Sequence, residues 1–412
     1  MRLIILMKKL ILLATLPVVA LYGCCGGEKV SKEAAAFETI SKEMKSQFAP
    51  DSRSKTLEVK LVETENGYAL KGVTNQPEAK EAYVKAFADK GIEVVDSIQM
   101  LPSEALEGKI YGVSNQSVIN FRTSGKYSAE SATQVMMGTP LQVLEKKGGW
   151  TRAITPEGYI SWVSSGSITY MNKEEFDAYK AAKKVIVTTK YATMYEAPNA
   201  KSQMVSDVVW GNILLDKGTQ GAWQKVAISD GREGYLPKAD VMDFNKWLDS
   251  RNPTADNIIE TAKQFIGVPY MWGGTSIKAV DCSGFCKSTY FLNGIVLVRD
   301  ASQQCHTGDN IDISKYVNDG EYTKEALANL KKGDLIFFGT KATAEKKERI
   351  THVGMYIGDG IFIHSATKVR INSLIPSDAN YYDGSKRLVR ASRILGNVDA
   401  GKDIWSIGEL YK

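Results

Sequence analysis

The alternation of hydrophobic and polar residues near the start of the chain predicts a small α+β domain. Residues 56–62 and 68–73 alternate as strands do, and an Asn-Gly turn lies between them. Pro77 opens a stretch with apolar residues at helical spacing, and residues 92–95 follow as a third strand. We expect this domain to occupy residues 51–108.

A pattern of short strands separated by turns then occurs twice. The interval from Gly138 to Trp150 equals the interval from Gly211 to Trp223. Repetition of this kind implies two copies of one small barrel, and each copy resembles a bacterial SH3-like module. The two expected modules span residues 109–170 and 184–243.

The last part of the chain places helices first and strands afterwards, which is typical of an α+β domain. Thr254 is a suitable N-cap for an apolar helical face, and a second helix is expected to begin near Cys282. Further on, residues 350–357 and 361–364 read as a hairpin with an Asp-Gly turn. The expected boundaries are residues 253–396 for the domain and 397–412 for a C-terminal tail.

The first 23 residues have another character, with basic residues ahead of an apolar run that is too short for a membrane span. They read as an export signal that ends in a site resembling that of bacterial lipoproteins. Lipidation of Cys24 is therefore expected to hold the protein at a membrane by acyl chains. Tyr22 departs from the usual small residue, so lipidation of Cys25 and ordinary signal cleavage are alternatives. Residues 24–50 are expected to form a tether or a short helix.

Composition and charge narrow the class of protein. Of the 412 residues, 43% are apolar and 24% charged, as in globular proteins with more than one domain. The net charge of +5 is small and the basic residues are scattered, which argues against a nucleic-acid binder. No pair of Cys or His residues has zinc-finger spacing, so we expect neither a metal nor a cofactor. A monomer is expected.

Three of the five cysteines lie outside the export segment. This odd number leaves at least one thiol unpaired in an oxidising compartment, which points to catalysis. Cys282 is the candidate nucleophile, because the free N–H groups and the dipole at a helix start favour a thiolate. A Cys286–Cys305 disulfide, or Cys305 beside His306 as the nucleophile, are alternatives.

Two of the three histidines fall in apolar strands of the last domain. His352 is the expected proton carrier, because imidazole titrates near neutral pH. His364 lies on the returning strand of the hairpin, where we expect it to bond the far nitrogen of His352 and fix its tautomer. Backbone N–H groups at the Cys282 helix start and the Tyr270 hydroxyl are the expected oxyanion donors. The pattern therefore predicts hydrolysis of an amide through a thiol.

Five sequence blocks of the last domain resemble NlpC-type cell-wall peptidases. In order they are PYMWGG at 269–274, DCSGF at 281–285, KGDL at 332–335, HVGMYIG at 352–358 and IHSA at 363–366. The resemblance implies a papain-like fold with a Cys282–His352–His364 site that hydrolyses peptide bonds in peptidoglycan stems. The expected fold is thus multidomain: a small α+β domain, two SH3-like β-barrels and a papain-like α+β domain.

The SH3-like modules ahead of that domain resemble the arrangement in γ-D-glutamyl-L-diamino acid endopeptidases of the dipeptidyl-peptidase VI type. The resemblance implies cleavage after γ-D-glutamate, with Glu130 and Tyr159 receiving the free amine of an N-terminal L-Ala. A carboxylate that faces an ammonium group selects a free N-terminus. A solvated Glu130 and a Tyr159 in the barrel core are the structural alternatives. The remaining expected substrate contacts are Asp281, Ser283, Asp300 and Ser302, with Ala301 where a serine is common.

The leading hypothesis is therefore an exported, lipid-anchored cysteine endopeptidase of the cell envelope that acts on muropeptides. One alternative is a wall-binding scaffold whose last domain is inert. The three catalytic positions all carry competent residues, which disfavours the scaffold. Another alternative is a thiol amidase or acyltransferase that acts on a different amide.

Overall fold

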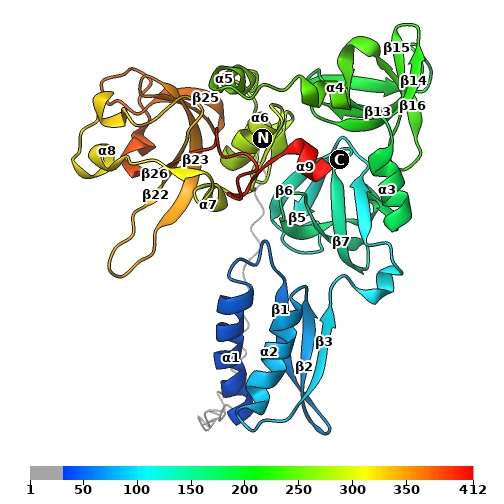
Figure 1. The fold of residues 1–412 in the computed structure, drawn as a ribbon, viewed down its shortest axis with the longest axis vertical. Coiled ribbons are helices and arrows are strands. Elements are labelled where there is room, and N and C mark those ends of the chain that lie inside the picture. The colour runs from blue at the N-terminus through cyan, green and yellow to red at the C-terminus, as the bar shows by residue number, and fades with distance from the viewer. Residues whose placement is uncertain (1–30, 412) are drawn as a thin grey trace, which may run out of the picture.

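The computed structural model describes residues 31–411, and the three parts of the chain meet at a central junction (Figure 1). The N-terminal α+β domain lies at the bottom of the view, the two β-modules lie on the right, and the last domain lies at the upper left. The predicted export segment and Cys24 lie outside the described residues. None of the helices within residues 31–411 has the length and apolar character needed to cross a membrane.

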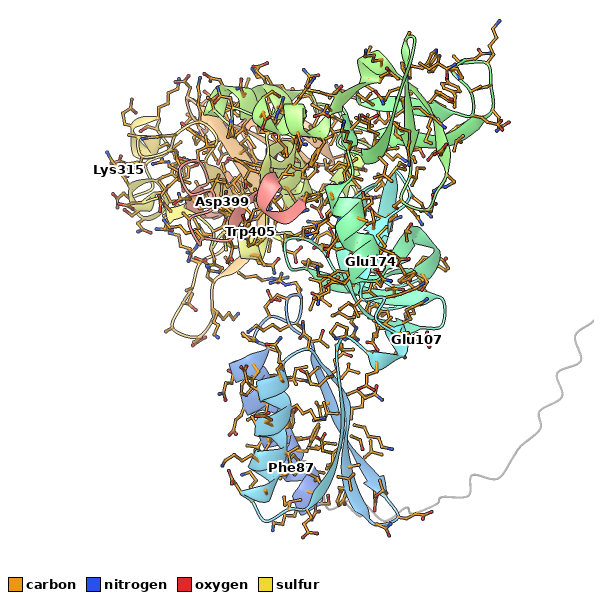
Figure 2. All side chains as sticks on the ribbon, turned by 45° about the vertical axis from the view of Figure 1, so that its right-hand side comes forward. Phe87, Glu107, Glu174, Lys315, Asp399 and Trp405 are labelled. Carbon is orange, nitrogen blue, oxygen red and sulfur yellow. The ribbon has the colours of Figure 1, made fainter. Side chains whose placement is uncertain are left out.

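The N-terminal domain is a three-stranded sheet covered by two helices. Its elements are α1 (Lys32–Phe48), β1 (Leu57–Thr64), β2 (Gly67–Thr74), α2 (Pro77–Ala88) and β3 (Val94–Met100). β1 pairs antiparallel with β2, and β3 pairs parallel with β2. Figure 2 shows Phe87 on α2, whose side chain is fully buried in this core.

Of the two alternatives for residues 24–50, a tether or a short helix, the structure shows a helix at α1, which is part of the domain. Ser31 caps the helix by accepting a hydrogen bond from the N–H of Ala34. Ile40 is fully buried in the core of this domain, and the Tyr83 hydroxyl donates to Ser41 Oγ over 2.8 Å. The helix is thus held by packing of its apolar face against α2.

The two middle modules have the same strand order. The first forms a seven-stranded sheet in the order β10-β4-β7-β8-β9-β5-β6, and the second repeats it as β17-β11-β14-β15-β16-β12-β13. Each strand of the second module therefore corresponds to the strand seven positions earlier, as two copies of one barrel require. The first module contains β4 (Tyr111–Ser114), β5 (Val118–Arg122), β6 (Ser131–Met136), β7 (Pro140–Lys147), β8 (Trp150–Ile154), β9 (Ile160–Ser164) and β10 (Ile168–Met171). After α3 (Lys173–Ala181), the second contains β11 (Lys184–Val187), β12 (Tyr191–Tyr195), β13 (Met204–Val209), β14 (Ile213–Gln220), β15 (Trp223–Ala227), β16 (Glu233–Pro237) and β17 (Val241–Asp243).

The last domain packs a buried helix against a six-stranded sheet of order β21-β26-β22-β23-β24-β25. The sheet consists of β21 (Asp309–Asn310), β22 (Leu335–Thr340), β23 (Arg349–Gly358), β24 (Ile361–Ala366), β25 (Lys368–Ser373) and β26 (Leu388–Arg393). The other elements are α4 (Phe244–Asp249), α5 (Ala255–Lys263), β18 (Thr275–Ser276), β19 (Ala279–Val280), α6 (Cys282–Phe291), β20 (Ile295–Leu297), α7 (Ala301–Gln304), α8 (Ser314–Asn318), β27 (Ile404–Ser406) and α9 (Ile407–Tyr411).

The segment expected to be a C-terminal tail is folded onto this domain. β27 pairs antiparallel with β20, and the side chains of Ile407 and Tyr411 on α9 are buried in the main core. The tail prediction is therefore wrong over these residues, because a three-residue strand and one helical turn leave little periodic signal in a sequence.

Helix α6 lies at the centre of the last domain and sets the position of the candidate nucleophile. A Cβ atom at Gly284 would lie 1.9 Å from the carbonyl oxygen of Gly274, so only glycine allows the helix to approach the turn before β18. The sheet supplies the opposite wall, since β23 and β24 contact α6. Their hairpin turns at Asp359 and Gly360, which have φ angles of 55° and 79°, as a type I′ turn requires.

Candidate active site

Cys282 is the first residue of α6, and the carboxylate of Asp281 caps that helix. Asp281 Oδ1 accepts a hydrogen bond of 2.7 Å from the N–H of Gly284. Cys282 is 7% exposed and lines a cleft. The sulfur contacts the backbone of Val353 on β23, the residue that follows His352. The thiol therefore lies against the strand that carries the expected base.

A chain of hydrogen bonds runs from His352 away from the cleft. His352 Nε2 lies 2.7 Å from His364 Nδ1, and His364 Nε2 lies 3.0 Å from Asn372 Oδ1. The amide nitrogen of Asn372 donates to the carbonyl oxygen of Asn380 over 2.8 Å, which leaves Oδ1 as the acceptor for His364. His364 then donates from Nε2 and accepts at Nδ1, so His352 carries its proton on Nε2. The lone pair of His352 Nδ1 is left to accept the thiol proton.

The helix start does not make Cys282 a resting thiolate, contrary to the expectation from sequence. Burial raises the pKa of the thiol to about 12, with a further contribution from Asp281, and this outweighs the hydrogen bond from the backbone of Val353. Burial, and secondly His364, lowers the pKa of His352 to about 3. Burial lowers the pKa of His364 to about 4 despite its bond to Asn372. At neutral pH the site thus holds a neutral thiol and neutral imidazoles.

The cleft in front of Cys282 has a volume of about 480 Å³, and three parts of the chain form its walls. The last domain contributes Cys282 and its neighbours, and the first SH3-like module contributes Glu130 and Tyr159. The third wall comes from the loop between α1 and β1, through Arg53. A ligand in this cleft therefore meets side chains from all three.

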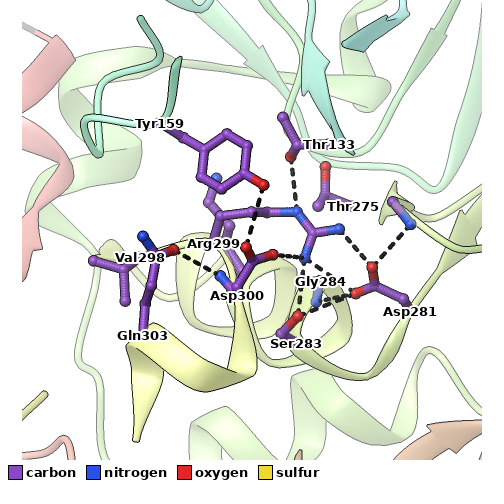
Figure 3. A network of polar contacts seen from close by, with 12 residues as sticks. Thr133, Tyr159, Thr275, Asp281, Ser283, Gly284, Val298, Arg299, Asp300 and Gln303 are labelled. Atoms are coloured by element: carbon purple, nitrogen blue, oxygen red, sulfur yellow. Dashed lines mark hydrogen bonds and ion pairs between the residues drawn. The ribbon is translucent and has the colours of Figure 1, made fainter. Parts of the chain in front are cut away.

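A buried arginine, Arg299, joins the first module to the start of α6 (Figure 3). It is 1% exposed and donates to Thr133 Oγ1 over 2.8 Å and to Ser283 Oγ over 2.9 Å. It also pairs with both carboxylate oxygens of Asp281, at 3.2 Å and 2.5 Å. Burial lowers the pKa of Arg299, but the charge and hydrogen bonds of Asp281, together with the charge of Asp300, outweigh it and keep the pKa above its ordinary value. These bonds favour a positioning role for Asp281 and Ser283, although both line the cleft.

The residues expected at the amine end of the substrate all line the cleft. Tyr159 is 8% exposed, and its hydroxyl donates to Asp300 Oδ2 over 3.2 Å (Figure 3). Ser302 lies two residues further along, in the first turn of α7, and Glu130 is exposed on the wall formed by the first module. Tyr159 thus combines the two alternatives, because its side chain is largely buried and also lines the cleft.

Tyr270 lies beside the candidate nucleophile. Burial raises the pKa of its hydroxyl, and the neighbouring Cys282 and Asp281 raise it further. The hydroxyl therefore stays protonated at neutral pH and is able to donate a hydrogen bond, as an oxyanion contact requires.

Three side chains of the site have no counterpart in the sequence prediction. Arg53 comes from the N-terminal domain, and no local motif marks it. Arg299 directly precedes the expected substrate contact Asp300, but the burial that defines its role is not visible in the sequence. Asn372 lies on β25, a strand whose sequence carries no pattern that we recognised. The pairing of β24 with β25 places Arg370 opposite His364, and Asn372 lies two residues further along the same strand. This register is the signal from which a polar partner of His364 could have been inferred.

Within residues 31–411 the chain has two further cysteines, Cys286 and Cys305. Cys286 and Cys305 are free and buried, so the alternative of a disulfide between them is wrong. Burial raises the pKa of Cys305 to about 11, and His306 beside it is exposed. Within residues 31–411, no group of three or more His, Cys, Asp or Glu side chains is placed to hold a metal ion.

The fold and this site define a papain-like cysteine peptidase, and comparison with known proteins identifies the family. Residues 267–391 match the NlpC/P60 family, and residues 117–169 match the bacterial SH3 domain. A γ-D-glutamyl-L-lysine dipeptidyl-peptidase of Bacillus cereus is 34% identical over 258 residues, which cover 61% of this chain and 72% of the relative. The chain belongs to the NlpC/P60 family.

A second curated protein and a solved structure are also similar to this chain. Dipeptidyl-peptidase 6 of Lysinibacillus sphaericus is 26% identical over 261 residues, 60% of this chain and 85% of the relative. The crystal structure of an NlpC/P60 family protein from Bacillus cereus superimposes with a TM-score of 0.55 at 26% identity, and the match covers 69% of this chain and 99% of that one.

Proposed function

We propose that the protein hydrolyses the γ-D-glutamyl–diamino acid bond of peptidoglycan stem peptides, with a preference for a free N-terminal L-Ala, in the degradation or recycling of cell wall. The observation that carries this proposal is the hydrogen-bonded His352–His364–Asn372 chain on the sheet that packs against α6, together with Cys282 in a cleft that the first SH3-like module completes. The name of the first Bacillus cereus relative supports the bond that is cleaved.

In the proposed mechanism His352 acts as base while Cys282 attacks. As the sulfur bonds to the γ-carbonyl carbon of D-glutamate, its proton passes to His352 Nδ1. The developing oxyanion receives hydrogen bonds from the backbone N–H at the start of α6 and from the Tyr270 hydroxyl. His352 then returns the proton to the leaving amine of the diamino acid, and the C–N bond breaks. Water, deprotonated by His352, hydrolyses the thioester and restores the thiol.

At the far end of the substrate, the ammonium of L-Ala is proposed to bind among Glu130, Tyr159, Asp300 and Ser302. Asp281 and Ser283 shape the cleft beside the nucleophile. We also propose that the protein is exported and held at the envelope by lipidation of Cys24, a residue outside the described part of the chain.

Hydrolysis of stem peptides should disappear after Cys282 is alkylated with iodoacetamide, whereas a wall-binding scaffold would keep its binding. Cleavage of another amide, with stem peptides left intact, would favour the alternative thiol amidase.

The pH profile should reflect a buried neutral base. His352 must be neutral to accept the thiol proton, and its pKa of about 3 lies below the ordinary 6.5. As the pH falls through 6.5, kcat/KM should therefore stay level, and the acid limb should have its midpoint below about 5.5. Assays after incubation at each pH, with activity re-measured at neutral pH, separate titration from unfolding. A midpoint near 6.5, or a rise in rate through pH 8–9, would indicate a solvated imidazole or a titrating thiol instead.

Glu130→Gln should weaken cleavage of peptides with a free N-terminus. The loss of one carboxylate facing an ammonium is expected to lower kcat/KM for L-Ala-γ-D-Glu-L-Lys by about 10-fold or more. Cleavage of the N-acetylated peptide should not change. Glu174→Gln on the exposed surface of α3 is the matched control and should behave as the parent. Equal rates on free and acetylated peptides in the parent protein would contradict the amine preference.

A further inference from the structure

The loop between α1 and β1 places an arginine of the N-terminal domain in the substrate cleft. Arg53 Nη1 donates to Asp300 Oδ2 over 2.8 Å and to Ser302 Oγ over 2.9 Å. The opposite edge of the same guanidinium makes two bonds of 2.8 Å to the carboxylate of Asp51. Arg53 thus lies between two carboxylates, one from its own loop and one from the last domain.

The fold holds this loop in place. The carbonyl oxygen of Arg53 accepts a hydrogen bond of 2.6 Å from the N–H of Ile160 in the first module. The Gln303 side chain donates to Asp51 Oδ2 over 3.0 Å. The N-terminal domain is also docked through an apolar cluster and an ion pair. The apolar cluster comprises Val73, Leu101, Leu144 and Ile160. The ion pair joins Glu58 to Arg152 at 2.8 Å. Arg53 is therefore held in a fixed position in the cleft wall.

Arg53 contacts Asp300 Oδ2, an oxygen that the proposed function assigns as a contact for the substrate's ammonium group. Asp300 Oδ2 also accepts the Tyr159 hydroxyl, and this corner is where the ammonium of L-Ala would bind. A guanidinium and an ammonium compete for one acceptor and repel each other at close range. We propose that Arg53 is a specificity-determining residue, a tethered cation that competes with the substrate's ammonium for Asp300. This inference rests on the proposed function.

The geometry shows how the competition is resolved when a peptide binds. Asp51 holds the guanidinium through two bonds, so Arg53 keeps one full ion pair after it gives up Asp300. Asp300 keeps its place, because the Tyr159 hydroxyl and the Gln303 side chain hold it: the Asp300 N–H donates to Gln303 Oε1 over 3.2 Å. The N-terminal domain therefore lowers the affinity for free-amine peptides without closing the cleft. A peptide without an ammonium group does not need this exchange.

Calorimetric titration of L-Ala-γ-D-Glu-L-Lys tests the competition. The full chain is used with Cys282→Ala, so that the peptide is bound and not cleaved. Arg53→Met and Arg53→Gln both remove the charge, and whichever folds serves. Each should lower Kd by about fivefold, the factor that one partly exposed charge contact contributes. Arg53→Lys, which restores a cation, should bring Kd back toward the parent. The N-acetylated peptide should bind the neutral variants and the parent alike.

Glu58→Gln is the matched control, because it breaks the ion pair with Arg152 at the domain junction without touching the cleft, and it should leave Kd unchanged. An unchanged or higher Kd in the neutral variants would overturn the inference, the latter by showing that Arg53 binds the substrate. An equal gain for the acetylated peptide would mean a steric plug and would overturn it too. Failure of the parent to cleave the free peptide would refute the proposed function itself, and this assay is independent of Arg53.

Discussion

Cys282→Ala is expected to lower kcat/KM for stem-peptide hydrolysis by about 10⁴–10⁶-fold, the loss seen when a nucleophile that acts as part of a unit is removed. The physical reason is that the acyl-enzyme route needs a sulfur at the start of α6, and neither His352 nor its partners is placed to attack the carbonyl. Cys282→Ala removes one buried sulfur atom and its weak hydrogen bond with the backbone of Val353, so the variant should stay folded.

The measurement is steady-state hydrolysis by the purified parent and variant, with thermal unfolding recorded for both. Cys305→Ala is the matched control, since it also removes a buried free thiol of the same domain and should retain parental activity. Substantial residual activity in a folded Cys282→Ala protein would show that another group performs the attack. A loss of activity in Cys305→Ala would revive the alternative in which Cys305 is the nucleophile.

Arg299→Met is expected to destabilise the last domain by about 3–5 kcal/mol, the cost of leaving a buried charge without its partner. Asp281 is 5% exposed, and Arg299 supplies the positive charge that pairs with both its oxygens, which otherwise accept only from the backbone N–H groups of Gly273 and Gly284 and from the Ser283 hydroxyl. Thr133 and Ser283 lose a donor in the same change. The substitution therefore disturbs the cap of α6 and the junction with the first module together.

Scanning calorimetry should show the transition of the last domain lowered by about 6–20 °C, given a shift of 2–4 °C per kcal/mol for a unit of this size. Lys85→Met, which breaks an exposed pair with Asp89, is the control and should change stability by less than about 0.5 kcal/mol. A transition within about 2 °C of the parent in Arg299→Met would show that Asp281 finds compensation elsewhere.

The local parts of the fold follow from local patterns in the sequence. The Asp359-Gly360 turn sets the hairpin register, and that register brings His352 and His364 together. The equal Gly-to-Trp intervals reflect two modules of identical strand order. These features depend on residues that are close in the chain, where turn geometry and side-chain period act directly.

The parts that the sequence did not predict depend on contacts between distant segments. Arg53 reaches Asp300 across 247 positions, and only the docking of the N-terminal domain brings them together. The protonation state of Cys282 depends on burial by β23, which outweighs the local effect of the helix start. The N-cap Ser31 is a sign of α1 that is present in the sequence. The many Lys and Glu residues of this helix nevertheless concealed the apolar face through which it packs.

The central claim is that Cys282 cleaves the bond between γ-D-glutamate and the diamino acid. The direct test is mass spectrometry of the products from L-Ala-γ-D-Glu-L-Lys-D-Ala incubated with the purified protein. We expect two products, with the masses of L-Ala-D-Glu and L-Lys-D-Ala, and neither product with Cys282→Ala. Release of free L-Ala or D-Ala would rule out cleavage at this bond. An intact peptide would also rule it out, if the same protein preparation cleaves another amide.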